Sequence, residues 1–149
     1  VTSYLQTLGV VYRRDVDNPV ALKGESLFAE AGCIGCHKTN ITTGETEIAR
    51  LENQLIHPYT DLLLHDMGEG LIGRPDFDAS RTEWRTQPLW GIGQIEMVNG
   101  HTNFLHDGRA RNIQEAILWH GGEADKSKEI YKQYDADDRA AILTFLNTL

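Results

Sequence analysis

The sequence has little cysteine, little positive charge and no long apolar run. Its 149 residues include only 2 cysteines, and 14 Lys and Arg stand against 22 Asp and Glu, for a formal net charge of −8. Because the basic residues are few and scattered, nucleic acid is not expected as a partner. No apolar run approaches the ~20 residues needed to cross a bilayer, so we expect no membrane span in this chain. With no second pair of cysteines, a four-cysteine zinc site is excluded as well.

The chain is expected to fold as one domain. A chain of 149 residues lies within the range of single domains and can bury roughly 70% of its unfolded surface. Its first residue is Val1 rather than Met, and no basic and then apolar leader follows, as in a processed protein or an excised fragment. No repeat or interior linker divides the sequence. We therefore expect a single domain over 1–149, with a lead-in segment over 1–18 and the main body over 19–149.

Both cysteines lie in one short motif. Cys33, Cys36 and His37 form the string CxxCH, which is the motif of c-type haem attachment. Two thiols at this spacing in the first turn of a helix can each add to one vinyl group of the porphyrin. The imidazole of the next residue then points at the iron. We predict one covalent haem c at Cys33 and Cys36, with His37 as an axial ligand of the iron.

Two other interpretations of the motif fit less well. A thioredoxin-type dithiol normally opens a helix after a strand in an alternating α/β pattern, and no such pattern is visible here. Half of a structural zinc site would need further ligands, which the sequence does not offer as a second cysteine pair. Haem c is usually joined to thiols outside the bacterial cytoplasm. The expected location is therefore periplasmic or otherwise exported.

Two helices are expected near the ends of the chain. Asn18 and Pro19 form a helix start, an apolar face follows, and a glycine ends the segment beside the haem motif. Near the C-terminus, Asp135 supplies an N-cap to a segment whose apolar residues recur at spacings of three and four. We expect these helices to cross and form the main core, with Phe28 near Phe145.

The middle of the chain is expected to combine short helices with long loops. Helices are predicted over 112–119 and within 51–64, whereas strand signals are sparse. The Thr- and Gly-rich stretch 39–46 predicts a short hairpin. The Gly- and Pro-rich stretches 67–76 and 88–108 predict ordered loops that wrap a haem edge. The fold class that follows is all-α, with long ordered loops around one covalent haem.

Several strings of the sequence resemble a known family. The segments around the haem motif and at the C-terminus, GESLF (24–28) and DDRAAILTFLNTL (137–149), resemble the paired terminal helices of cytochromes c. More specific strings resemble the bacterial di-haem oxidoreductases, also labelled thiol oxidoreductases, which are related to di-haem cytochrome c peroxidases. These strings are HPYTDLLLHDMG (57–68), EWRTQPLWGIG (83–93), GHTNFLHDGR (100–109) and EAILWHGGE (115–123).

The resemblance covers essentially the whole chain and has consequences for fold and partners. The string RRDVD (13–17) resembles the segment that precedes the second haem motif, so the chain resembles the C-terminal half of those proteins. It implies a cytochrome c-like fold, and a redox partner protein or a second haem domain as partner. Family members carry two CxxCH motifs and this chain carries one. Haem attachment at this one motif would use both sulfurs of the chain.

The second axial ligand has several candidates. Besides His37, the sequence offers five histidines and two methionines, namely His57, His65, His101, His106, His120, Met67 and Met97. Spacing alone slightly favours Met97, which follows His37 by a long interval and lies in a Gly-bounded loop. The resemblance instead implies His120, which follows the 105–108 string at the end of a helix and precedes two glycines. His120 is our prediction, with Met97 and Met67 as the alternatives.

Other residues are candidates for contacts with the haem propionates. Arg85 and Arg109 are the best placed of the arginines, because guanidinium groups make bidentate contacts with carboxylates. His106 and His65 are expected to orient loops or to bond the propionates.

Two functions of different class follow from these residues. With His37 and His120 both on the iron, the chain is a bis-His electron-transfer domain, the C-terminal half of a di-haem oxidoreductase. The alternative is a peroxidase-like enzyme with an open iron position and a nearby acid or base. The coordination number of the iron separates the two.

Overall fold

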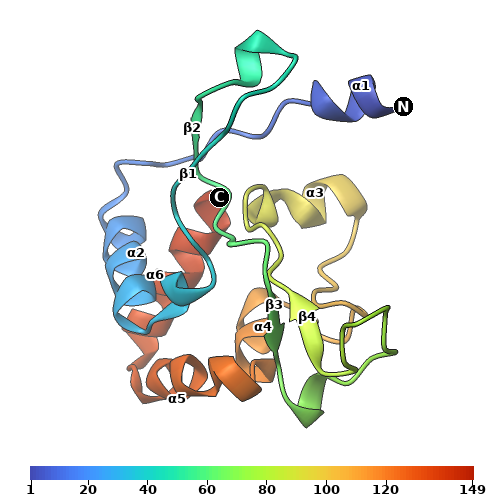
Figure 1. The fold of residues 1–149 in the computed structure, drawn as a ribbon. Helices are drawn as coiled ribbons and strands as arrows, with labels where there is room; N and C mark the ends of the chain where they lie inside the picture. Colours follow the sequence, from blue (N-terminus) through green and yellow to red (C-terminus); the bar gives the residue numbers. More distant parts are fainter.

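Two long helices from opposite ends of the chain form the core of the structure, a computed structural model that describes all 149 residues (Figure 1). Helix α2 spans Pro19–Glu30 and helix α6 spans Ala136–Thr148. The two lie side by side, and the ring centroids of Phe28 and Phe145 are 5.5 Å apart. The predicted pairing of the terminal helices is therefore confirmed.

Local capping chemistry explains where both helices begin. The side chain of Asn18 accepts hydrogen bonds from the backbone of Val20 and Ala21, and proline occupies the first turn of α2. The side chain of Asp135 accepts from the backbone of Asp138 at the start of α6. These contacts satisfy N–H groups that a helix leaves unpaired at its first turn.

The two helices approach each other closely at one glycine. A Cβ atom added at Gly24 would overlap the backbone carbonyl of Ala141, which is fully buried. The absence of a side chain at Gly24 is thus a condition for the crossing. Around it lies the buried cluster Leu27, Phe28, Tyr59, Tyr131, Ala141, Ile142, Phe145, Leu146 and Leu149.

Shorter helices cover the rest of the chain. The α-helices are α1 (Thr2–Gln6), α3 (Ile95–Asn99), α4 (Ile113–Trp119) and α5 (Asp125–Gln133). The 3-10 helices are η1 (Cys33–Gly35), η2 (Ala49–Leu51), η3 (Glu69–Leu71), η4 (Ile92–Gln94) and η5 (Gly122–Ala124). Helix α4 is confirmed, whereas α3 and α5 were not predicted. None of the helices combines the length and hydropathy of a membrane-spanning segment.

Two small antiparallel sheets show that the predicted all-α, cytochrome c-like fold class is wrong. Strands β1 (Ile41–Thr42) and β2 (Leu55–Ile56) form one sheet, and β3 (Leu64–Asp66) and β4 (Glu83–Arg85) form the other. The fold is mixed, because pairs of extended segments satisfy each other's backbone groups. Strand β2 lies in the stretch predicted to contain a helix, and β3 and β4 form a sheet that was not predicted. The stretch 39–46 does contain a strand, but its partner is β2 rather than a segment within the stretch.

The helix predicted within 51–64 is absent. Three residues of this stretch, Asn53, Tyr59 and Leu62, have φ values between +53° and +61°, which a right-handed helix does not allow. Pro58 also disfavours helical backbone in the residue before it. The stretch therefore holds the end of η2, strand β2 and the first residue of β3.

Part of the lead-in segment packs on the C-terminal end of α6. The backbone N–H of Arg14 donates to the carbonyl of Thr148 at 2.8 Å, and its guanidinium donates to the carbonyl of Asn147 at 2.7 Å. These contacts satisfy carbonyls that the last turn of a helix leaves free. The boundary between 1–18 and 19–149 stays a prediction.

Candidate functional site

The CxxCH motif lies in a tight turn after α2. Gly32 has a φ of +83°, a conformation that glycine adopts without strain, and it redirects the chain into η1. The backbone N–H of His37 then donates to the carbonyl of Cys33 at 3.0 Å. The turn therefore brings the two thiols and the imidazole into one short segment, and the thiols do not form a disulfide.

The environment of the two thiols disfavours thiol redox chemistry. Burial raises the pKa of Cys33 to about 11, and burial followed by the nearby Asp61 and Glu123 raises the pKa of Cys36. A dithiol that exchanges disulfides needs the opposite, since a lowered pKa supplies the reactive thiolate. The structure thus gives no support to the thioredoxin-type interpretation.

The His37 ring is held in one tautomer. Its Nδ1 donates to the carbonyl of Tyr59 at 2.8 Å. Burial lowers the pKa of His37 to about 4, so the ring is neutral at ordinary pH. With the proton on Nδ1, the lone pair is on Nε2, which makes no hydrogen bond within the chain. This is the state in which an imidazole binds a metal.

His120 has the same arrangement. It lies at the C-terminal cap of α4, and its Nδ1 donates to the carbonyl of Ala116 at 2.8 Å. Burial lowers its pKa too, and a charge on His120 would lower the pKa of His37, so the two rings lie within electrostatic range. Both imidazoles that the sequence singled out therefore have an Nε2 that makes no hydrogen bond within the chain.

The end of α4 is fixed by a close backbone contact. Gly122 has a φ of +53°, and a Cβ atom there would overlap the carbonyl of Asp66. Gly121 approaches the carbonyl of Met67 in the same way. Only glycines allow strand β3 to pass this near, so the pair that follows His120 anchors the end of the helix against β3.

The remaining ligand candidates are less suited to the role. Met97 lies on α3 with 74% of its surface exposed, so little of the protein surrounds it. Met67 is half-buried beside Gly121. His57 and His101 are exposed and bind neighbouring loop atoms.

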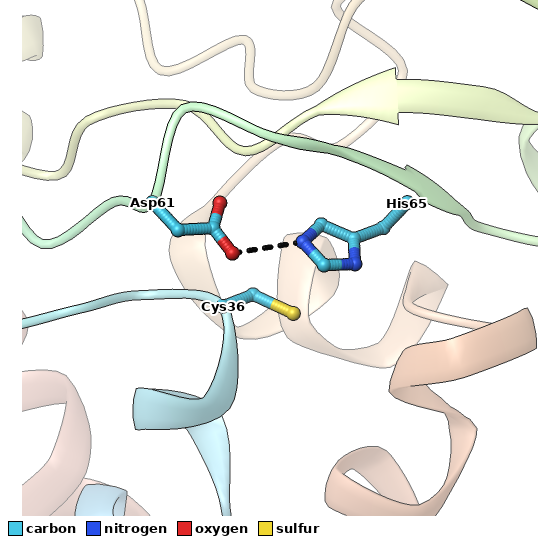
Figure 2. A group of neighbouring side chains, drawn as sticks. All are labelled: Cys36, Asp61 and His65. Atoms are coloured by element: carbon cyan, nitrogen blue, oxygen red, sulfur yellow. Dashed lines mark hydrogen bonds and ion pairs between the residues drawn. The ribbon is translucent and has the colours of Figure 1, made fainter.

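His65 is engaged at both ring nitrogens. Its Nε2 pairs with Asp61 at 2.9 Å and its Nδ1 pairs with Glu123 at 2.8 Å. The hydrogen bond to Glu123 and then that to Asp61 raise the pKa of His65. Figure 2 shows the Sγ of Cys36 beneath the Asp61–His65 pair, and one potential ligand atom from each of the three lies within 4.8 Å of the others.

This cluster is an ion-pair network beside the haem motif rather than a convincing metal site. A structural zinc site uses four ligands, whereas three groups converge here and two of them are already paired. The carboxylates can hold a proton on His65 next to Cys36. The sequence analysis named His65 as a candidate site residue but did not name Asp61 or Glu123. The four-residue spacing of Asp61 and His65 was a weak signal for their pairing.

The residues predicted to contact the haem propionates lie in different surroundings. His106 stacks on Trp84, with ring centroids 3.7 Å apart. Arg109 pairs with Asp107, and its guanidinium lies 5.0 Å from the Trp119 ring, next to His120 in sequence. Arg85 is exposed on β4, one residue from the position that faces His65, so it points to the other side of the sheet. Arg85 is thus not brought to the cluster.

The donor set fits a haem. Two thiols with the attachment spacing and two neutral imidazoles with free Nε2 atoms are what covalent binding and axial ligation of a haem iron require. Fold and site together describe a haem-dependent redox protein.

Comparison with known families agrees with that class. The whole chain, residues 1–149, matches the family described as "Di-haem oxidoreductase, putative peroxidase". The chain belongs to this family, which confirms the resemblance seen in the sequence and a haem-related redox role. No curated protein and no solved structure matches the chain.

Proposed function

We propose that this chain is a c-type electron-transfer domain, the C-terminal half of a di-haem oxidoreductase. Cys33 and Cys36 would hold one haem covalently, and the imidazoles of His37 and His120 would be the protein ligands of its iron. The observation that carries the proposal is that the His37 and His120 rings share the same protonation state and the same hydrogen bonding. Each is half-buried and neutral, and each has Nδ1 bound to a backbone carbonyl and Nε2 free.

The residues of the chain explain how such a site would work. The carbonyls of Tyr59 and Ala116 fix the orientation of the two rings and increase their basicity at Nε2. When bound, the haem supplies a one-electron centre whose potential depends on axial ligands and burial. With both imidazoles engaged as ligands, the chain would relay electrons and would leave no position for an oxidant.

A second candidate function is a peroxidase-like enzyme with an open iron position. The observation in its favour is the His65 cluster, in which two carboxylates hold a protonatable ring next to Cys36. Such a group could give or take a proton during the reduction of an oxidant. This function requires that His120 is not bound to the iron.

The proposed partner is a second haem domain or a redox partner protein, and the proposed location is the periplasm or another exported site. Support for the location comes from the CxxCH motif, because haem c is usually attached outside the bacterial cytoplasm. Expression in the cytosol of a host without haem-ligation machinery should give a chain without haem. Efficient haem attachment there would contradict this support.

Covalent attachment is tested by extraction and mass. Acid–acetone treatment should leave the haem on the protein, and mass spectrometry should show one haem per chain. In the Cys33→Ala and Cys36→Ala variants one of the two thioether bonds is missing, and in the double variant the haem should be extractable. Extractable haem in the unmodified protein would refute the covalent site.

The axial ligand is tested by substitution. His120→Ala should open a coordination site, turn the ferric spectrum high-spin and allow cyanide to bind. The Met97→Ala and Met67→Ala variants are the controls and should stay low-spin. If the unmodified protein shows a methionine-to-iron charge-transfer band that Met97→Ala or Met67→Ala abolishes, His120 is not the ligand. A high-spin unmodified protein would favour the peroxidase-like function.

A further inference from the structure

Tyr59, whose carbonyl binds the His37 ring, has a backbone conformation that its side chain disfavours. Its φ is +53°, in the left-handed region that residues with a Cβ atom rarely adopt. Such a conformation persists only where the surroundings hold it in place. It aims the carbonyl at Nδ1 of His37, at 2.8 Å. Whatever holds Tyr59 therefore also holds the His37 ring.

A series of side-chain contacts leads from Tyr59 to the lead-in segment. The Tyr59 hydroxyl donates to Oε1 of Glu25 at 3.1 Å, and Oε2 of Glu25 pairs with Nη1 of Arg13 at 2.9 Å. Nε of Arg13 donates to Oγ1 of Thr148 at 3.2 Å. The Arg13 guanidinium also lies 5.0 Å from the centre of the Phe145 ring. We call Arg13, Glu25 and Tyr59 the tether.

Packing alone does not account for these contacts. The Tyr59 ring is 4% exposed and lies against the rings of Phe28 and Phe145, at 6.5 and 5.7 Å between centroids. Aromatic packing of this kind places the ring in the core. The hydroxyl is the polar anchor of the side chain, and its partner Glu25 is itself fixed by a charged neighbour.

We propose that Arg13, Glu25 and Tyr59 are positioning residues for the axial ligand His37, because they hold the Tyr59 carbonyl against Nδ1–H. This inference rests on the proposed function, since it assigns the tether a role in tuning His37 as a ligand. A firm hydrogen bond at Nδ1 makes Nε2 a stronger donor and favours ferric iron. A loosened tether should weaken that bond and favour the reduced form.

The first test replaces the hydroxyl and keeps the ring. In the holoprotein, Tyr59→Phe should raise the midpoint potential and speed the solvent exchange of the His37 Nδ1–H, followed by NMR of the ferrous protein. We expect about a tenfold change in the ratio of reduced to oxidised protein, which is about 59 mV for one electron. Tyr131→Phe is the matched control, because Tyr131 is 1% exposed and its hydroxyl has no partner.

The second test acts on the middle of the tether. Glu25 lines a cavity of about 600 Å³ together with Arg13 and Tyr59, so its replacement leaves the packed core intact. Glu25→Ala should raise the potential as Tyr59→Phe does, and Glu25→Gln should raise it less, because an amide oxygen still accepts from the hydroxyl. If Tyr59→Phe and Glu25→Ala match Tyr131→Phe in potential and in exchange rate, the tether has no positioning role.

Failure of the proposed function is recognised separately. A preparation without covalent haem would contradict the haem site. The hydrogen bond from His37 Nδ1 to the Tyr59 carbonyl can then still be measured in the haem-free protein. The exchange of the His37 Nδ1–H is then compared among the same variants. Faster exchange in Tyr59→Phe and Glu25→Ala would support the tether, and equal rates in all variants would overturn it.

Discussion

The core formed by α2 and α6 is tested most directly at Phe145. This side chain is fully buried, and its ring centroid lies 5.5 Å from that of Phe28 and 5.7 Å from that of Tyr59. The Arg13 guanidinium covers its face at 5.0 Å. Phe145→Ala therefore removes apolar burial, two aromatic contacts and one cation–π contact at once.

The expected loss can be worked out from these contacts. Truncation of a buried Phe to Ala costs about 3–5 kcal/mol, because the cavity that remains collapses only in part. Each aromatic pair adds roughly 0.5–1.5 kcal/mol beyond area burial, which places Phe145→Ala in the upper half of that range. A domain has only about 5–15 kcal/mol of stability in total, so the variant should lose about a quarter of it or more. At about 2–4 °C per kcal/mol, a loss of about 4–5 kcal/mol should lower the thermal midpoint by roughly 8–20 °C.

Phe77 provides the matched control, because it is the same residue type and is fully exposed. Urea and thermal unfolding of Phe145→Ala and Phe77→Ala, followed by far-UV circular dichroism, compare the two. Phe77→Ala should unfold within about 0.5 kcal/mol of the unmodified protein. If Phe145→Ala unfolds at the same urea concentration as Phe77→Ala, the α2–α6 core is wrong.

Three further predictions follow from the same structure. Gly24→Ala should lower the free energy of unfolding in urea by about 1–3 kcal/mol, because the new Cβ meets the α6 backbone. This loss is expected although alanine favours helices. The control Gly44→Ala should be near neutral, because open space surrounds Gly44. Asn18→Ala should cost about 1 kcal/mol, and a serine there should restore most of it. The raised pKa of His65 means that its contribution to the free energy of unfolding is full below about pH 6.5 and is lost as pH rises through the folded pKa. His65→Gln should therefore reduce the fall of stability above that pH, and an unchanged pH profile would contradict the ion-pair network.

Local chemistry made some elements of the fold predictable. Asn18 and Asp135 are caps whose effect depends on the next three residues only, so both long helices could be placed from the sequence. Helix α5 was missed because Ile130 and Tyr131 are its only large apolar residues. Its signal lies in polar pairs at i,i+3, such as Lys128 with Asp125.

Elements that depend on distant partners were not predictable. Strands β3 and β4 have three residues each, and each is stabilised by a partner some twenty residues away. In the site, the CxxCH motif has a recognisable spacing, but the backbone carbonyl of Tyr59 has no side-chain signature that a sequence could show. Its role follows from a left-handed φ value that only the folded chain reveals. His120 as the iron ligand stays a prediction.

The α2–α6 pairing also determines the order in which the protein can assemble. The two helices are separated by more than a hundred residues, and ribosomes produce chains from the N-terminus. The core is thus complete only after α6 has been synthesised, and such distant contacts slow folding. Cys33 packs at the edge of that core. Before α6 packs on α2, the Cys33 thiol lacks this cover, so Cys33 is more accessible in the incompletely folded chain than in the finished fold.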